Sequence, residues 1–109
     1  MKSMPARIGG KNVFQDLGFG KAAAEEALAK SELISAMART IKTRKLTQKE
    51  AARLCRTDQP TLSKVLRGRM ESVTIDRLTA WLNALGRSVE IRIGGRVDER
   101  GGHLVVRVP

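Results

Sequence analysis

A chain of 109 residues with a formal net charge of +10 is long enough for one small domain and an appendage. It holds no apolar run near the roughly 18 residues of a membrane-spanning helix, and no signal-peptide pattern opens it. Its single cysteine excludes an internal disulfide, so we expect a protein of the reducing cytoplasm.

Residues 1–20 are predicted to form a flexible arm ahead of the folded domain. Within the arm, residues 12–20 read NVFQDLGFG and hold both phenylalanines of the chain. This segment is too apolar for a simple tail and too short to form a core element alone. It either packs back on the helices or docks a partner protein, as apolar residues in flexible arms do. The candidate partner-binding residues are Val13, Phe14, Leu17 and Phe19.

The longest helical pattern spans residues 21–44, where alanine and leucine favour a helix. One face of this helix should be buried, because its apolar residues recur at helical spacing. These residues are Leu33, Ile34, Met37 and Ile41. Ser31 could interrupt the helix and start a second one, and residue propensities do not decide between the two arrangements.

Two short amphipathic patterns, separated by a tight break, occupy residues 47–68 (TQKEAARLCRTDQPTLSKVLRG). Thr47 and Glu50 have the spacing of a capping box at the start of the first helix. Asp58 should cap the second helix, and Gly68 is placed to end it. The apolar faces comprise Ala51, Ala52, Leu54 and Cys55 in the first helix and Leu62, Val65 and Leu66 in the second. The opposite face of the second helix is polar and cationic, which indicates a helix-turn-helix.

Positive charge gathers on this motif. Between residues 40 and 70, nine cations stand against two carboxylates, a net of +7, whereas residues 21–39 hold three of each and net zero. Phosphate binding requires such clustering, and a generally basic surface is the alternative. The nine residues, called here the cationic cluster, are Lys42, Arg44, Lys45, Lys49, Arg53, Arg56, Lys64, Arg67 and Arg69.

A further helix should begin at Thr74 and end at Gly86. Trp81 flanks its apolar stripe, so we expect this side chain in the core or at a dimer interface rather than as a base-stacking platform. The stripe consists of Ile75, Leu78, Leu82 and Leu85.

The final residues, 87–109, change to an alternating pattern that predicts two strands. Two strands alone are only marginally stable, so the first should pair with its copy in a second subunit, and the second could fold back as a hairpin arm. The candidate dimerisation residues are Val89, Ile91 and Ile93. The sole histidine, His103, has no metal-binding pattern around it and is expected at the surface.

The motif at 47–68 resembles the helix-turn-helix of lambda-repressor and Cro proteins, in the branch often named XRE-like. The residues that carry this resemblance are Thr47, Gln48, Ala51, Asp58, Gln59, Pro60, Thr61, Leu62, Val65, Leu66 and Gly68. It implies a mainly α-helical bundle of four to five helices over 21–86, followed by a C-terminal β-strand or β-hairpin used for dimerisation. Arg56 stands where the family usually has glycine. A left-handed conformation there would cost roughly 1 kcal/mol, unless the turn is built differently.

The resemblance also implies how the protein would bind double-stranded DNA. Gln59 is the first candidate for reading a base, because a carboxamide can pair bidentately with adenine. Lys64 could reach guanine or a phosphate, and Gln48 could contact a phosphate while buttressing Gln59. The candidate DNA-binding residues are Gln48, Lys49, Gln59, Pro60, Thr61, Ser63, Lys64, Arg67 and Arg69. A homodimer would place two recognition helices about 34 Å apart on an inverted-repeat operator.

Over residues 12–93 the chain is similar to HigA-like antitoxins, mainly through the NVFQDLGF arm and the LNALGRSVEI passage. This similarity implies a repressor that binds its own operator and neutralises a small basic RelE/HigB-like ribonuclease toxin, with Phe14 and Leu17 as candidate contacts. A stand-alone, phage-type regulator of the same family is the alternative. We expect no enzyme and no cofactor, because the chain lacks a catalytic set of residues and a phosphate-binding loop.

Overall fold

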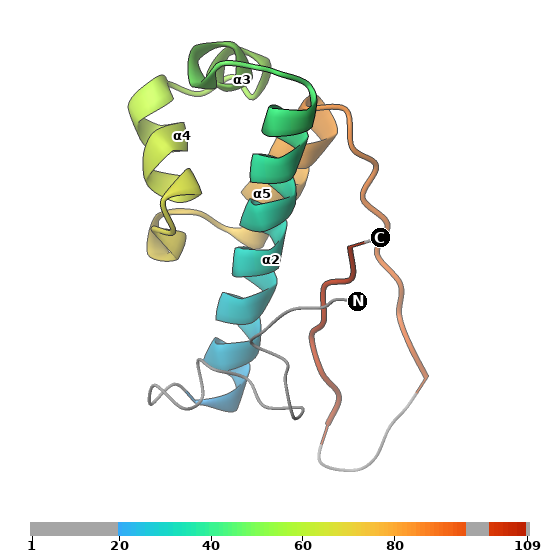
Figure 1. Ribbon diagram of the computed structural model, residues 1–109. Helices are drawn as coiled ribbons and strands as arrows, with labels where there is room; N and C mark the ends of the chain where they lie inside the picture. Colours follow the sequence, from blue (N-terminus) through green and yellow to red (C-terminus); the bar gives the residue numbers. More distant parts are fainter. Residues whose placement is uncertain (1–19, 96–100, 109) are drawn as a thin grey trace.

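The computed structural model describes residues 20–95 and 101–108, which form a helical bundle and two extended C-terminal segments. A long helix, α2, is packed along α5, while α3 and α4 lie together beside the C-terminal half of α2 (Figure 1). The elements are α2 (Lys21–Thr43), α3 (Gln48–Leu54), α4 (Gln59–Leu66), the 3₁₀ helix η2 (Met70–Ser72) and α5 (Ile75–Ala84). The four α-helices of the described residues confirm the predicted mainly α-helical bundle.

Helix α2 is continuous through Ser31, which answers the question that propensities left open. The Ser31 hydroxyl donates a hydrogen bond to the carbonyl oxygen of Leu28 across 2.8 Å, so its polar side chain is satisfied within the helix. The four apolar residues predicted to share a face are all buried, namely Leu33, Ile34, Met37 and Ile41.

The core lies where α2, α3, α4 and α5 meet, and its largest fully buried side chains come from α2, from α4, and from α5 with the residue that caps it. Trp81 is 4% exposed, which confirms the prediction of a core residue. The Cys55 thiol donates to the carbonyl oxygen of Trp81 across 3.8 Å, and burial raises the pKa of this thiol to about 11. Cys55 is therefore a packed side chain rather than a reactive one.

Each of these α-helices is followed, two positions after its last residue, by a residue in the left-handed region, and two of these four residues are not glycine. Gly68 and Gly86 have φ of 102° and 96°, while Lys45 and Arg56 have φ of 58° and 57°. After α3, the N–H of Arg56 donates to Arg53 across 3.1 Å and that of Thr57 to Ala52 across 3.0 Å. These bonds form a Schellman ending. Arg56 thus adopts the conformation that glycine usually supplies, at a cost of about 1 kcal/mol.

Polar side chains fix the end of α5 against the last turns of α2. The Arg87 guanidinium donates to the Thr40 hydroxyl across 3.0 Å, and that hydroxyl donates to the carbonyl oxygen of Ala36 across 2.7 Å. The Arg44 guanidinium donates to the carbonyl oxygen of Leu85 across 2.9 Å. These contacts hold the C-terminal segment at the point where it leaves the bundle.

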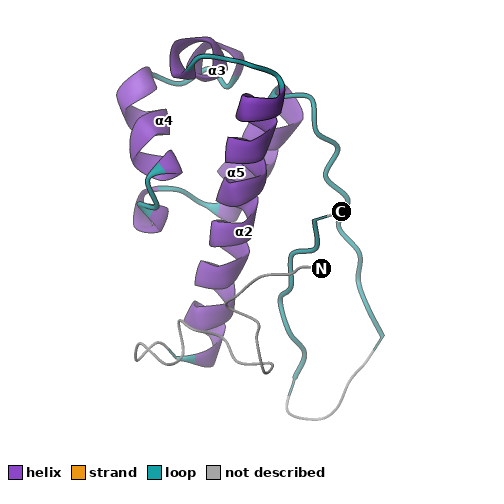
Figure 2. Ribbon diagram, in the orientation of Figure 1, coloured by secondary structure: helices purple, strands orange, loops and turns teal. Residues whose placement is uncertain are grey.

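The two predicted C-terminal strands find no support in the described residues of the single chain. The described residues 87–95 and 101–108 form no strand, and Figure 2 draws both segments as loops. A cavity of about 310 Å³ lies between them, so they do not join in a common hydrogen-bond ladder. The three apolar residues predicted to share one face of the first strand have different surroundings. Val89 packs on the core, whereas Ile91 and Ile93 are 81% and 92% exposed. A strand needs a partner for its backbone, and residues 20–95 and 101–108 of one chain supply none.

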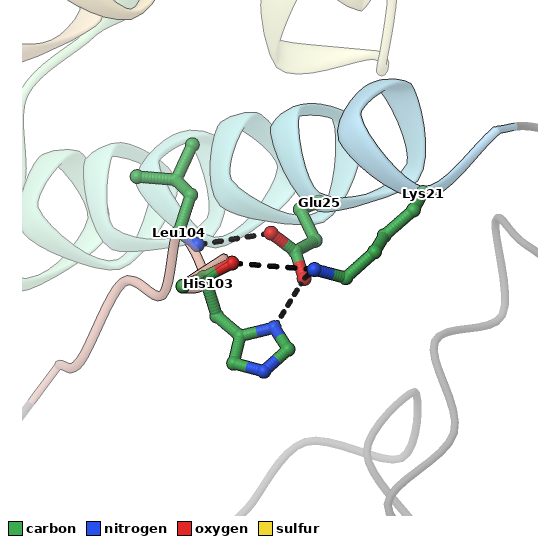
Figure 3. Close-up of polar contacts among 5 residues, drawn as sticks. Lys21, Glu25, His103 and Leu104 are labelled. Carbon is green, nitrogen blue, oxygen red and sulfur yellow. Dashed lines mark hydrogen bonds and ion pairs between the residues drawn. The ribbon is translucent and has the colours of Figure 1, made fainter. Parts of the chain in front are cut away.

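The second extended segment is tied to the first turns of α2 (Figure 3). The Glu25 carboxylate accepts a hydrogen bond from the Leu104 N–H across 3.0 Å and lies 2.8 Å from Nδ1 of His103. The Lys21 ammonium donates to the carbonyl oxygen of Gly102 across 3.2 Å. The Leu104 N–H, followed by the His103 ring, lowers the pKa of Glu25. His103 is at the surface as predicted, but its carboxylate neighbour was not foreseen.

Candidate nucleic-acid interface

Helix α4 is fixed at its start by its own sequence and along its back by the core. The Asp58 carboxylate accepts a hydrogen bond from the Thr61 N–H across 2.7 Å, which confirms the predicted cap. Pro60 lies in the first turn, where no helical hydrogen bond needs its missing N–H. Leu62 and Val65 are completely buried. Anchored in this way, α4 turns its other face to solvent.

Helix α3 is capped by the predicted capping box. The Thr47 hydroxyl accepts a bond from the Glu50 N–H across 3.0 Å, and the Glu50 carboxylate accepts one from the Thr47 N–H across 2.8 Å. Ala51 and Ala52 are buried, and their small side chains let α3 approach α4 closely. Leu54 is 41% exposed, however, so its predicted place on the buried face is wrong. Leu54 is the last residue of α3, and the next residue, Cys55, is buried in the core.

The two capping carboxylates are held in their charged form. The Thr61 N–H lowers the pKa of Asp58, and the Thr47 N–H lowers the pKa of Glu50. Negative charge at a helix N-terminus is favourable because it faces the positive end of the helix dipole. The only two carboxylates of residues 40–70 therefore serve the helix ends.

The predicted DNA-binding residues come from three neighbouring places. Gln48 and Lys49 open α3, five of the residues belong to α4, and Arg67 and Arg69 follow the end of α4. Seven are exposed and two are half-buried. The exposed residues are Gln48, Lys49, Gln59, Pro60, Lys64, Arg67 and Arg69, and the half-buried ones are Thr61 and Ser63. In the described residues no hydrogen bond joins Gln48 to Gln59, so this buttress stays a prediction for the DNA-bound state.

All nine residues of the cationic cluster are exposed, but one of them makes a hydrogen bond within the fold. Arg44 is occupied by the carbonyl oxygen of Leu85, so it stabilises the fold. The side chains of the other eight make no hydrogen bond or ion pair with described residues. These eight unpaired cations suit an anionic surface with closely spaced charges, such as a nucleic-acid backbone.

Other candidate sites are missing or lie outside the described ranges. Val13, Phe14, Leu17 and Phe19, predicted to bind a partner, fall outside the described residues. Within the part of the chain that the structure describes, no group of His, Cys, Asp or Glu could hold a metal ion. No helix in that part is both long and apolar enough to cross a lipid bilayer.

Comparison with known proteins gives two matches. A family model described as a helix-turn-helix domain matches residues 13–94. The chain is also similar to a solved structure provisionally described as an XRE-family transcriptional regulator, with a TM-score of 0.71 and 31% sequence identity. This second match covers 80% of this chain and 98% of the other. None of the curated proteins matches the chain.

Proposed function

The chain belongs to the XRE family of helix-turn-helix DNA-binding regulators, and from this premise we propose that it is a dimeric, sequence-specific repressor of transcription. The exposed face of α4 is the observation that carries the proposal. This helix is capped by Asp58 and anchored by Leu62 and Val65, and it offers Gln59 and Lys64 to solvent. A rigid helix with a polar outer face is what base reading in a major groove needs.

Residues of the interface divide by their chemistry. Gln59, in the first turn of α4, can donate to and accept from the edge of adenine. Lys64 lies further along α4 and reaches guanine or a phosphate. Arg67 and Arg69 follow α4 and carry charge on long side chains, so they suit phosphates rather than bases. Affinity for any duplex then comes from the eight cations of the cationic cluster other than Arg44, and preference for one sequence comes from Gln59.

A dimer would recognise a longer DNA sequence than one subunit can. One recognition helix reads only a few base pairs, whereas two of them, about 34 Å apart, read both halves of an inverted repeat. We place the protein in the cytoplasm, acting without a cofactor or catalytic activity of its own.

A gel-shift titration tests the proposal. The probe is the promoter region upstream of the protein's own reading frame, and the matched control is a scrambled duplex of equal length and composition. Both are titrated at two salt concentrations. We expect tighter binding to the promoter at both concentrations, and a fall in affinity for both duplexes as salt rises. Equal affinity for the two duplexes would contradict a sequence-specific repressor.

A second proposal makes the protein an antitoxin that also neutralises a ribonuclease toxin. Its support is the resemblance of residues 12–93 to HigA-like antitoxins, together with a family model that begins at residue 13 and so includes most of the NVFQDLGF arm. An arm that belongs to the family's common sequence is more than a dispensable tail. The stand-alone regulator shares every DNA-binding residue and differs only in lacking this partner.

The neighbouring genes and the arm test this second proposal. We expect a reading frame for a small basic ribonuclease-like protein beside this one, and we expect its product to co-purify with the full chain. Deleting residues 1–20 should release that product while leaving operator binding intact. Absence of such a frame would favour the stand-alone regulator, and a complex that survives the deletion would move the contact away from Phe14 and Leu17.

A further inference from the structure

The first extended segment carries apolar side chains that the described residues leave uncovered. Ile91 and Ile93 are 81% and 92% exposed, although large aliphatic side chains gain free energy by leaving water. The described residues also offer no strand partner to the backbone of 88–93. An unpaired, apolar, extended segment is suited to receive another strand at its edge.

The sequence of this segment is complementary to itself. In Val89-Glu90-Ile91-Arg92-Ile93, apolar residues alternate with two opposite charges placed symmetrically about Ile91. Glu90 and Arg92 already form an ion pair across 3.4 Å within one chain, with both side chains exposed. Two such segments running antiparallel can therefore match apolar to apolar and anion to cation.

We infer that two copies of this chain pair antiparallel through residues 88–94, with a two-fold axis at Ile91. Ile91 then lies opposite Ile91 of the partner subunit, and Val89 opposite Ile93 of the partner subunit. Glu90 lies opposite Arg92 of the partner subunit, and the symmetry gives each such contact twice. The inference rests on the dimer of the proposed function and supplies its interface.

Neighbouring registers fit less well. An axis at Glu90 puts two glutamates directly opposite each other, and an axis at Arg92 does the same with two arginines. Like charges in directly opposite positions destabilise a strand pair. An axis between two residues places an apolar side chain opposite a charged one and mixes both kinds on one face of the sheet. Of these registers, only the axis at Ile91 satisfies the apolar and the charged positions together.

The surroundings leave room for a second copy. The cavity of about 310 Å³ beside residues 87–92 has an apolar floor formed by α2 and α5, including Leu33 and Leu82. The other extended segment, residues 103–108, lines the far side of this cavity without filling it, and Glu25 holds its first residues, His103 and Leu104, against α2. The edge of the first segment is therefore open to an extended chain, and charge complementarity identifies that chain as a copy of itself.

Single cysteines test the register directly. Directly opposite residues of antiparallel strands have Cα atoms about 4.5–5.5 Å apart, within the range of a disulfide. Ile91→Cys should therefore give a disulfide-linked dimer on mild oxidation, seen on a non-reducing gel. Ile93→Cys is the matched control, because its copy lies four residues along the partner strand, about 13 Å away. The buried Cys55 should form no disulfide in either variant. Equal cross-linking of the two variants, or none at position 91, would overturn the register.

Charge exchange provides a second test, read by sedimentation equilibrium. Glu90→Arg and Arg92→Glu should each raise the dimer dissociation constant about tenfold, because each puts like charges opposite each other twice. The double variant restores both pairs and should regain the wild-type constant. A double variant as weak as the single ones would refute the pairing of Glu90 with Arg92 of the partner subunit.

These experiments distinguish failure of the dimer proposal from failure of the DNA-binding proposal. A wild-type chain that sediments as a monomer would remove the dimer and this interface, whereas its preference for the promoter duplex over the scrambled one would still decide the DNA-binding proposal. A wild-type dimer without the Ile91→Cys cross-link would keep the dimeric repressor and overturn this interface alone.

Discussion

The backbone N–H of Leu104 donates a hydrogen bond to the Glu25 carboxylate across 3.0 Å, although the two residues are 79 positions apart in the chain. His103 lies against the same carboxylate at 2.8 Å, and Lys21 completes the cluster from one turn earlier in α2 (Figure 3). One acidic side chain thus attaches the C-terminal segment to the first turns of α2.

Glu25→Ala should release this attachment. Hydrogen bonds to charged groups are among the stronger ones in proteins, so the Leu104 amide should exchange its hydrogen about tenfold faster in the variant. Hydrogen exchange followed by NMR measures the rate. Glu26→Ala is the matched control, because Glu26 is on the same helix and pairs with Lys30. Similar exchange rates in the two variants would mean that Glu25 does not hold the segment.

Leu62→Ala should destabilise the fold by about 2–5 kcal/mol, because it leaves a cavity behind α4 where the side chain is fully buried. Leu54→Ala removes the same atoms from a side chain that is 41% exposed and should cost much less. Urea unfolding followed by circular dichroism gives the free energy of unfolding of both variants. Equal losses would show that α4 is not anchored through Leu62.

Gln59→Ala should weaken binding to the cognate operator by about 1–3 kcal/mol and loosen specificity at one base pair. The loss arises because an adenine edge is left without its bidentate partner. Gel-shift titrations with the cognate duplex and with single-base variants measure both effects. If affinity fell equally for the operator and for random DNA, Gln59 would be a general contact and not a reader of sequence.

Arg69→Ala should weaken binding to every duplex to a similar degree. Loss of one phosphate contact releases one counterion fewer, so the slope of log K against log salt should flatten by about one. Titrations over a range of salt concentrations measure this slope. Arg107→Ala removes an arginine that is also exposed but lies far along the chain from the motif, and it should leave the slope unchanged.

Acid should unfold the protein partly through its helix caps. The pKa of Asp58 lies below its ordinary 3.8 and that of Glu50 below its ordinary 4.5, in both cases because a backbone N–H binds the charged form. Stability from these caps is therefore complete above about pH 5 and is lost as the pH falls through the lowered values. Asp58→Asn keeps a capping oxygen without a titrating group, so its urea midpoint should depend less on pH in this range. An unchanged pH dependence would show that Asp58 does not contribute.

Features that depend on neighbouring residues could be predicted from the sequence. The capping box of Thr47 and Glu50, the cap at Asp58 and the endings at Gly68 and Gly86 each involve residues only a few positions apart. Their geometry follows from residue type and spacing. The buried face of α2 was equally accessible, because helical periodicity alone defines it.

Features set by distant residues or by a second chain could not be read in this way. No local pattern connects His103 to Glu25, which is 78 positions away. The alternation of 87–93 signals an extended segment correctly. A strand also needs a neighbour, and the part of the single chain that the structure describes supplies none. At Arg56 the sequence left two structures of the turn open, and its φ of 57° identifies the left-handed one.

The position of Trp81 has a practical consequence. The protein has one tryptophan and no tyrosine, so its fluorescence under excitation at tryptophan wavelengths comes from a single indole, 4% exposed, in the middle of α5. That indole packs in the same core as the anchoring side chains of α4 and is not itself one of the residues proposed to meet DNA. Its emission should therefore change when the core unfolds and change little when a duplex binds. Unfolding can then be followed by tryptophan fluorescence without interference from DNA binding.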